Sequence, residues 1–179
     1  MKTHILTLAK TFPAKHPRHG EPTYFKERLM RALFKYYYGI DVIEKNWIYP
    51  EEQHKFLLPK PHTIRGNYDR MKKIVDEVNR GEAVLSLREW SGVPYRSPQE
   101  EIEIFTKDDG LGVQKLEWKE MYPFDGKHYT MVIDGKFFDD YAWLANNDGL
   151  ALENWRAWFK GADLSEPMAI IQFTDFRYC

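Results

Sequence analysis

The chain has 179 residues, of which 43% are hydrophobic and 16% aromatic, and its net charge is −1. This composition can build a folded core and excludes general disorder, while a single cysteine, Cys179, excludes an internal disulfide framework and a cysteine-rich zinc site. No signal-peptide pattern opens the chain, and no stretch approaches the roughly 18 apolar residues of a membrane span. We therefore expect one cytoplasmic domain over residues 1–179 with no membrane partner.

The charge is distributed unevenly along the chain. Residues 1–81 hold 16 Lys and Arg against 9 Asp and Glu, a net charge of +7, whereas residues 82–179 carry −8. A basic half can attract phosphates, and Lys15 and Arg18 are candidates for contact with RNA. Two solvated faces of opposite charge would give the same counts, so the charge leaves nucleic-acid binding open.

The start of the chain predicts a strand and a helix. Residues 5–8 are typical of a strand, and apolar residues at helical spacing from residue 25 onward predict a helix with Thr23 as its N-cap. The three consecutive tyrosines at 36–38 begin a predicted insertion over residues 36–57, which could be a hairpin or a loop.

A second helix follows a stiff loop over residues 58–67. Asn67 can cap this helix, and Gly81 stops it. Its expected buried stripe consists of Met71, Ile74, Val75 and Val78.

Strands dominate the second half of the chain. Apolar runs, period-2 patterns and Asp-Gly turns predict strands at 83–88, 102–104, 113–118, 129–133 and 168–173. Short helices are predicted at 138–145 and 152–159, and a second insertion at 119–137. The order predicts an α+β fold built on a small, closed, mostly antiparallel β-barrel with helices at its ends. The first and last strands would pair to close it, in the same sheet as 83–88.

The segment Lys60-Pro61-His62-Thr63-Ile64-Arg65 is the first candidate for chemistry. Proline restricts the backbone on both sides of Lys60. In an extended chain Thr63 and Arg65 share a face, and a bend at Pro61 would bring Lys60 alongside Thr63. A lysine whose pKa is lowered by burial can serve as base to a hydroxyl nucleophile. A surface turn with a structural hydroxyl is the alternative.

A turn after the buried strand is the second candidate, and it contains Trp90, Ser91, Tyr95 and Arg96. Trp90 and Tyr95 could stack on a base while Arg96 meets a phosphate. The alternative is that both aromatic residues belong to the core.

Asp148, in Asn147-Asp148-Gly149, is the third candidate. An aspartate between two helices can form a turn, cap the second helix or act in catalysis. The histidines show no metal-ligand spacing, so we expect no metal and no cofactor; those considered are His16, His19, His54, His62 and His128.

These segments together resemble the ASCH domain, a branch of the PUA-like β-barrels, over roughly residues 58–176. The shared features are the K-x-x-T-x-R element starting at Lys60, the strand ending in Trp90-Ser91-Gly92, the Asn147-Asp148-Gly149 turn, the late helix and the last strand at 170–173.

The resemblance implies binding of RNA or a modified base in a cleft. One characterised small bacterial ASCH enzyme is an N4-acetylcytidine amidohydrolase, and Lys60, Thr63 and Asp148 match its catalytic lysine, threonine and acid, with aspartate in place of glutamate. We therefore expect a nucleobase, nucleoside or RNA site lined by these residues and Arg65, with Trp90 and Tyr95 as stacking groups. The alternatives are an amidohydrolase acting on N-acylated nucleosides and a protein-interaction module that uses the tyrosines at 36–38.

Overall fold

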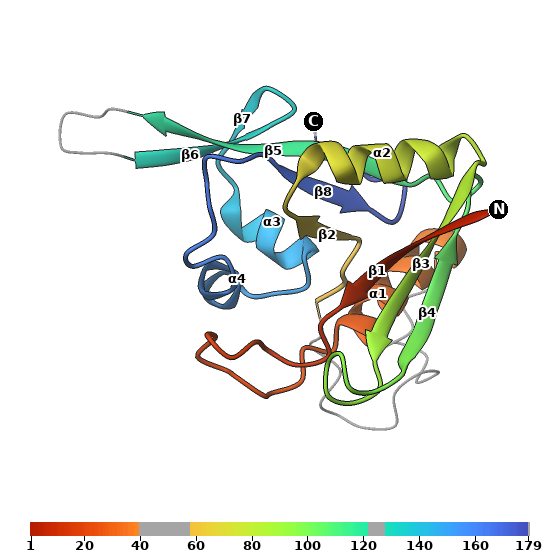
Figure 1. Cartoon of the computed structure of the whole chain (residues 1–179). Helices are drawn as coiled ribbons and strands as arrows, with labels where there is room; N and C mark the ends of the chain where they lie inside the picture. Colours follow the sequence, from red (N-terminus) through yellow and green to blue (C-terminus); the bar gives the residue numbers. More distant parts are fainter. Residues whose placement is uncertain (40–57, 122–127, 179) are drawn as a thin grey trace.

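The computed structural model describes residues 1–39, 58–121 and 128–178. In chain order they form β1 (Lys2–Leu8), α1 (Phe25–Tyr38), β2 (His62–Arg65), α2 (Tyr68–Asn79), β3 (Ala83–Trp90), β4 (Gln99–Phe105), β5 (Gly112–Met121), β6 (His128–Ile133), β7 (Lys136–Phe138), α3 (Tyr141–Asn147), α4 (Leu152–Trp158) and β8 (Met168–Gln172) (Figure 1). None of the helices in these three ranges is both long enough and apolar enough to cross a membrane.

The strands form two sheets. The smaller has the order β1-β3-β4, with β1 parallel to β3, and the larger has the order β2-β8-β5-β6-β7 and is antiparallel throughout. The α+β class and the mostly antiparallel pairing are confirmed. The prediction of a closed barrel is wrong, because neither sheet closes on itself. β8 lies between β2 and β5 and has no free edge for β1, while β1 pairs with β3 instead.

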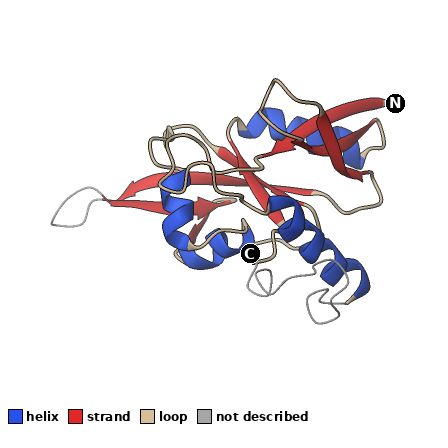
Figure 2. Ribbon diagram, turned by 90° about the horizontal axis from the view of Figure 1, so that it is seen from below, coloured by secondary structure: helices blue, strands red, loops and turns tan. Residues whose placement is uncertain are grey.

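Helices cover both faces of the larger sheet. Figure 1 shows α2 along one face and α3 and α4 below the other. Cross-strand partners place His62 and Ile64 on the face toward α3 and α4, where Trp118 of β5 meets Trp155 of α4. Thr63 and Arg65 therefore belong to the opposite face of β2. Figures 1 and 2 both show the β5–β6 hairpin extending away from the helices.

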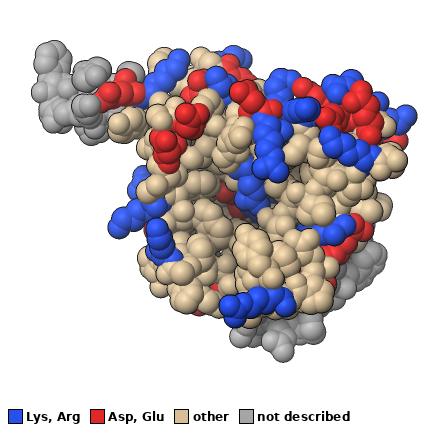
Figure 3. Space-filling model, viewed as in Figure 1, with Lys and Arg blue, Asp and Glu red and all other residues tan. Residues whose placement is uncertain are grey.

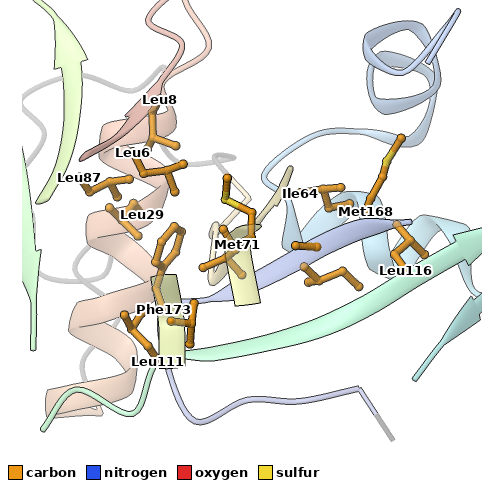
Figure 4. Packing of buried hydrophobic residues seen from close by; sticks show 14 of the residues in the cluster. Leu6, Leu8, Leu29, Ile64, Met71, Leu87, Leu111, Leu116, Met168 and Phe173 are labelled. Carbon is orange, nitrogen blue, oxygen red and sulfur yellow. The ribbon is translucent and has the colours of Figure 1, made fainter. Parts of the chain in front are cut away.

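One hydrophobic core joins the two sheets. Leu6 and Leu87 come from the smaller sheet, and Ile64 and Leu116 come from the larger, in a single cluster (Figure 4). The rings of Phe105, at the end of β4, and Phe173, directly after β8, stack with centroids 5.2 Å apart. The chain thus does not divide into separate cores on either side of residue 81.

The start of α1 differs from the expectation. Tyr24, with a φ of 57°, occupies the N-cap position and makes no side-chain cap bond. The hydroxyl of Thr23 instead donates to the carbonyl of Ala9 at 2.6 Å and accepts from the Phe25 amide at 3.3 Å. The helix continues through Tyr38, so residues 36–38 are helical and not part of a hairpin or loop. Residues 40–57 lie outside the described part of the chain.

Helix α2 matches its prediction closely. The Asn67 side chain accepts from the Arg70 amide at 3.2 Å, the stripe residues Met71, Val75 and Val78 are buried, and Gly81 follows with a φ of 75°. The helix expected from residue 138 begins only at Tyr141, because the Asp140 carboxylate caps it by accepting from the Trp143 amide at 2.8 Å.

The predicted insertion at 119–137 contains the end of β5, all of β6 and the start of β7, with residues 122–127 outside the described part. The predicted loop at 58–67 contains the strand β2.

Candidate functional site

The amine of Lys60 and the carboxylate of Asp148 meet in the interior. Lys60 is 1% exposed and Asp148 is 5% exposed. Lys60 Nζ donates to the Asp148 backbone carbonyl at 2.7 Å and makes a short ion pair with Asp148 Oδ1. The same amine lies 4.3 Å from the centroid of the Phe25 ring, a cation–π contact. A carboxylate, a carbonyl and a ring thus surround one amine.

The chain around Lys60 is held on both sides. Its backbone N–H donates to the Arg28 carbonyl of α1 at 2.9 Å, the chain bends at Pro61, and the Pro61 carbonyl accepts from the Phe173 amide at 2.8 Å. The proline-stiffened segment is therefore clamped between α1 and the residue that follows β8.

Asp148 ends α3, and of the alternatives open for it the capping of the next helix is excluded, because Ala151 holds that position in α4. The next residue, Gly149, has a φ of 81°, and a Cβ there would lie 3.2 Å from both Lys60 Cβ and Arg28 Cδ. Because glycine has no Cβ, it accommodates both the left-handed backbone conformation at this turn and the close approach of α1.

Burial moves the pKa values of the pair toward each other. Desolvation lowers the pKa of Lys60 from 10.5 to about 8, although the charge of Asp148 opposes the shift. Desolvation likewise raises the pKa of Asp148 against the effect of Lys60. The Trp155 indole also favours the charged form of Asp148 and lowers its pKa, but its buried N–H makes no hydrogen bond of normal geometry to any described residue. The amine is consequently a readier base near neutral pH than an exposed lysine.

Thr63 follows Lys60 by three residues and is 2% exposed. Its backbone pairs with Ile171 of β8, and its hydroxyl forms no side-chain hydrogen bond within the described residues. The Lys60 amine bonds to Asp148, and within the described residues no hydrogen bond joins it to the Thr63 hydroxyl.

Arg65 shares a face of β2 with Thr63, as the alternation predicts, but it does not pair with Asp148. Its guanidinium donates to the Thr7 carbonyl of β1 at 2.9 Å and to the Ile64 carbonyl at 3.3 Å. Burial lowers its pKa while the charge of Asp148 raises it, so the two groups are electrostatically coupled without direct contact. Arg65 therefore links the edge of the larger sheet to the smaller one.

The surface is hollowed beside these residues. Figure 3 shows a hollow at the centre of the face, over the C-terminal end of α3 and the strand β2, with acidic and basic side chains at its bottom. Two further cations act on Lys60 here, since Arg65 and Arg28 both lower its pKa. The Arg28 guanidinium is itself held by the Thr23 carbonyl at 2.9 Å and the Leu58 carbonyl at 3.4 Å. Asp148 is the carboxylate that lies against Lys60.

The second predicted group lies elsewhere. Trp90 is the last residue of β3, and its ring centroid is 5.3 Å from that of Tyr95, which is 90% exposed. The Ser91 amide donates to Pro98 at 2.9 Å, and the exposed Arg96 sits in the same turn. Within the described ranges, no hydrogen bond, ion pair or ring contact joins this turn to Lys60 or Asp148. The structure thus separates the predicted stacking groups from the buried pair.

Arg18, a predicted RNA contact, is engaged within the protein. Its guanidinium pairs with the Glu21 carboxylate at 2.6 Å and lies 4.8 Å from the Phe12 ring centroid. This pairing reduces the positive charge that Arg18 offers to a phosphate.

A buried polar cluster next to Asp148 was not predicted. The hydroxyl of Tyr178 contacts His62 Nε2 at 2.8 Å and accepts from Asn147 Nδ2 at 3.0 Å. Burial lowers the pKa of His62 well below its usual value, so its ring is neutral. The alternation along β2 places His62 opposite Thr63, but no feature of the sequence points to Tyr178 as its partner.

The described residues contain no group of three or more His, Cys, Asp or Glu side chains that could hold a metal ion. Comparisons of the chain with protein-family models, curated proteins and solved structures found no match. The candidate site therefore rests on its geometry.

Proposed function

We propose that the hollow beside β2 and α3 binds a nucleobase or nucleoside, free or within RNA, and that the chain is an ASCH-like member of the PUA-like group. The observation that carries this proposal is the buried pair of Lys60 and Asp148. Burying two opposite charges costs several kcal/mol per ion, and apolar residues of similar volume often serve stability as well or better. A buried acid and base with shifted pKa values beside a hollow are more simply explained by recognition or catalysis.

The chemistry of the pair suits the edge of a base. A nucleobase presents hydrogen-bond donors and acceptors side by side, and an ammonium next to a carboxylate presents the complementary set. The hydroxyl of Thr63, which has no side-chain partner among the described residues, can supply a further donor or acceptor. The resemblance to ASCH domains supports this assignment, since the acid paired with Lys60 stands before the late helix α4 as that resemblance implies.

Calorimetric titration with a panel of nucleosides that includes cytidine and N4-acetylcytidine tests the proposal. We expect saturable binding by the wild type and roughly tenfold weaker binding by Thr63→Val, which keeps the side-chain shape and removes the hydroxyl. Lys73→Met, a change at an exposed lysine of α2, is the matched control and should bind normally. Absence of binding to every nucleoside, or equal binding by Thr63→Val, would contradict the assignment.

An amidohydrolase is the second candidate, and the lowered pKa of Lys60 favours it. Neutral Lys60 would take the proton of Thr63 as Oγ1 attacks the acyl carbon of an N-acylated base. Collapse of the adduct would break the C–N bond, and the released amine of the base would take the proton from Lys60. Water would then hydrolyse the ester on Thr63 to free acid, and Asp148 would position Lys60 throughout.

This second function requires Lys60 to turn from Asp148 toward Thr63. Release of acetate and cytidine from N4-acetylcytidine measures it directly. Turnover should rise with pH as Lys60 loses its proton near pH 8 and should vanish in Thr63→Ala. Binding without turnover in the wild type would leave recognition as the function.

A further inference from the structure

We propose a second binding site, between α1 and β4, for an organic cation: an ammonium or guanidinium group carried on a short apolar body. The site is a cleft of about 350 Å³ formed by the C-terminal half of α1, the end of β4 and the turn that follows. This volume falls in the range of small-molecule sites, about 300–1,000 Å³. The proposal does not depend on the nucleoside site.

The cleft offers apolar contact on its floor and wall. Leu33 and Phe105 are buried at its base, at 3% and 1% exposure. Phe34 and Tyr38 form part of the wall, with ring centroids 5.5 Å apart. Tyr38 remains 66% exposed, and Tyr37 beside it is 44% exposed. Such rings leave considerable apolar surface for an incoming group to cover.

The charge of the cleft has one sign. Among the described residues, its lining includes the carboxylates of Glu103 and Asp109 and no lysine or arginine. Asp109 is fixed, since its carboxylate accepts from the Tyr37 hydroxyl at 3.0 Å and from the Thr106 amide at 2.6 Å. Glu103 is held more loosely by the Ile104 amide, which donates to its Oε1 at 3.0 Å. The other carboxylate oxygen of Glu103 accepts no hydrogen bond within the described residues and is available to a cation.

Aromatic walls and carboxylates together select a positive charge. The faces of tyrosine and phenylalanine rings carry negative potential and attract ammonium groups. Burial and the bond to Asp109 raise the pKa of Tyr37, so its hydroxyl stays neutral and the wall adds no further anion. An anionic ligand would be repelled by both carboxylates, and a neutral apolar ligand would leave them without a counter-charge.

Two probes of equal size test the role of charge. Phenethylammonium carries an amine on a phenyl ring, and 2-phenylethanol replaces that amine with a neutral hydroxyl. We expect tyrosine-ring NMR resonances of the full chain to shift saturably with phenethylammonium, and binding of 2-phenylethanol to be at least about tenfold weaker. Glu103→Gln keeps an acceptor for the Ile104 amide and should weaken amine binding by a similar factor. Glu100→Gln, on the same strand but outside the cleft, should not change it.

A further arm identifies the source of the cation. N-acetyl-lysine methylamide presents the ammonium as a peptide does. Tighter binding of this compound than of phenethylammonium would identify the ligand as a basic side chain of a partner. Tighter binding of phenethylammonium would indicate a small amine. Equal binding of the amine and the alcohol, an unchanged affinity in Glu103→Gln, or no binding of either cation would overturn the proposal. Each of these results would leave the nucleoside site untouched.

Discussion

The side-chain amine of Lys60 bonds to both the carboxylate and the backbone carbonyl of Asp148, a residue 88 positions later in the chain. This contact joins the proline-stiffened segment before β2 to the end of α3. It does so in the interior, where both ions lose most of their hydration.

Removing one member of the pair should destabilise the protein strongly. Lys60→Met leaves the Asp148 carboxylate buried without its partner, and we expect the free energy of unfolding to fall by about 3–5 kcal/mol. Lys60→Met combined with Asp148→Asn should recover part of this loss, because no uncompensated charge remains. Urea unfolding of the single and double variants measures the coupling. A double variant no more stable than Lys60→Met would show that the charges do not compensate each other.

The pair should also make stability depend on pH. The folded pKa of Lys60 is lowered from 10.5 to about 8, so between these pH values the unfolded chain retains a proton that the folded chain has lost. The free energy of unfolding should therefore rise with pH across this window, by about 3 kcal/mol in total.

Other lysines and tyrosines titrate in the same range, so the informative quantity is the difference between the wild type and Lys60→Met at each pH. Asp148→Asn removes the negative charge that opposes the lowering of the Lys60 pKa. The rise of the free energy of unfolding should therefore begin at a lower pH in this variant. A wild-type profile parallel to that of Lys60→Met would show that Lys60 titrates normally.

Gly149 and Gly161 form a matched pair for testing the close contact beside Lys60. Both have a left-handed φ, 81° and 83°, but a Cβ at Gly161 would meet nothing within 4 Å, whereas one at Gly149 would lie 3.2 Å from Lys60 Cβ. Gly161→Ala should cost about 1–2 kcal/mol for the backbone conformation alone. Gly149→Ala should cost more and should also weaken nucleoside binding, because Lys60 must shift. If thermal unfolding shows equal losses of stability for Gly149→Ala and Gly161→Ala, the side chains around Gly149 can move to accommodate a Cβ without a measurable cost.

Arg65 should contribute to the junction between the sheets. Arg65→Met removes the charged donor of the Thr7 carbonyl, and we expect the free energy of unfolding to fall by about 1–3 kcal/mol. Arg70→Met, at an exposed arginine near the start of α2, should stay within about 0.5 kcal/mol of the wild type in the same denaturant titration. If both variants are equally stable, the hydrogen bond from Arg65 of β2 to the Thr7 carbonyl of β1 contributes little to the free energy of unfolding.

Local features were predictable where the determining residues are close in sequence. Helix α2 is an example, since its cap at Asn67, its buried stripe and its stop at Gly81 all lie within 15 residues. Which strands pair with each other was not predictable, because the alternation of side chains along β1 is compatible with any buried neighbouring strand. The pairing of Lys2 with Ala83 is decided by tertiary packing.

The site was predicted in part for the same reason. The stiff segment and the turn after α3 each mark a candidate residue, and the structure brings Lys60 and Asp148 together. The partner of Arg65 is a backbone carbonyl, that of Thr7, which has no signature in the sequence. The aromatic pair of Trp90 and Tyr95 looked like part of the same site, but it lies on the other sheet, and only the sheet topology reveals this.

The most direct test of the central claim is to map a bound nucleoside on the wild-type protein by methyl NMR. Thr63 and Ile64 lie on opposite faces of β2, the strand beside the hollow, Ile104 lies on β4, and Val93 lies in the exposed turn with Tyr95. If the hollow is the binding site, titration with N4-acetylcytidine or cytidine should shift the methyl resonances of Thr63 and Ile64 saturably and leave those of Ile104 and Val93 unchanged. Shifts confined to Val93 or Ile104, or no shifts with any nucleoside, would contradict the account.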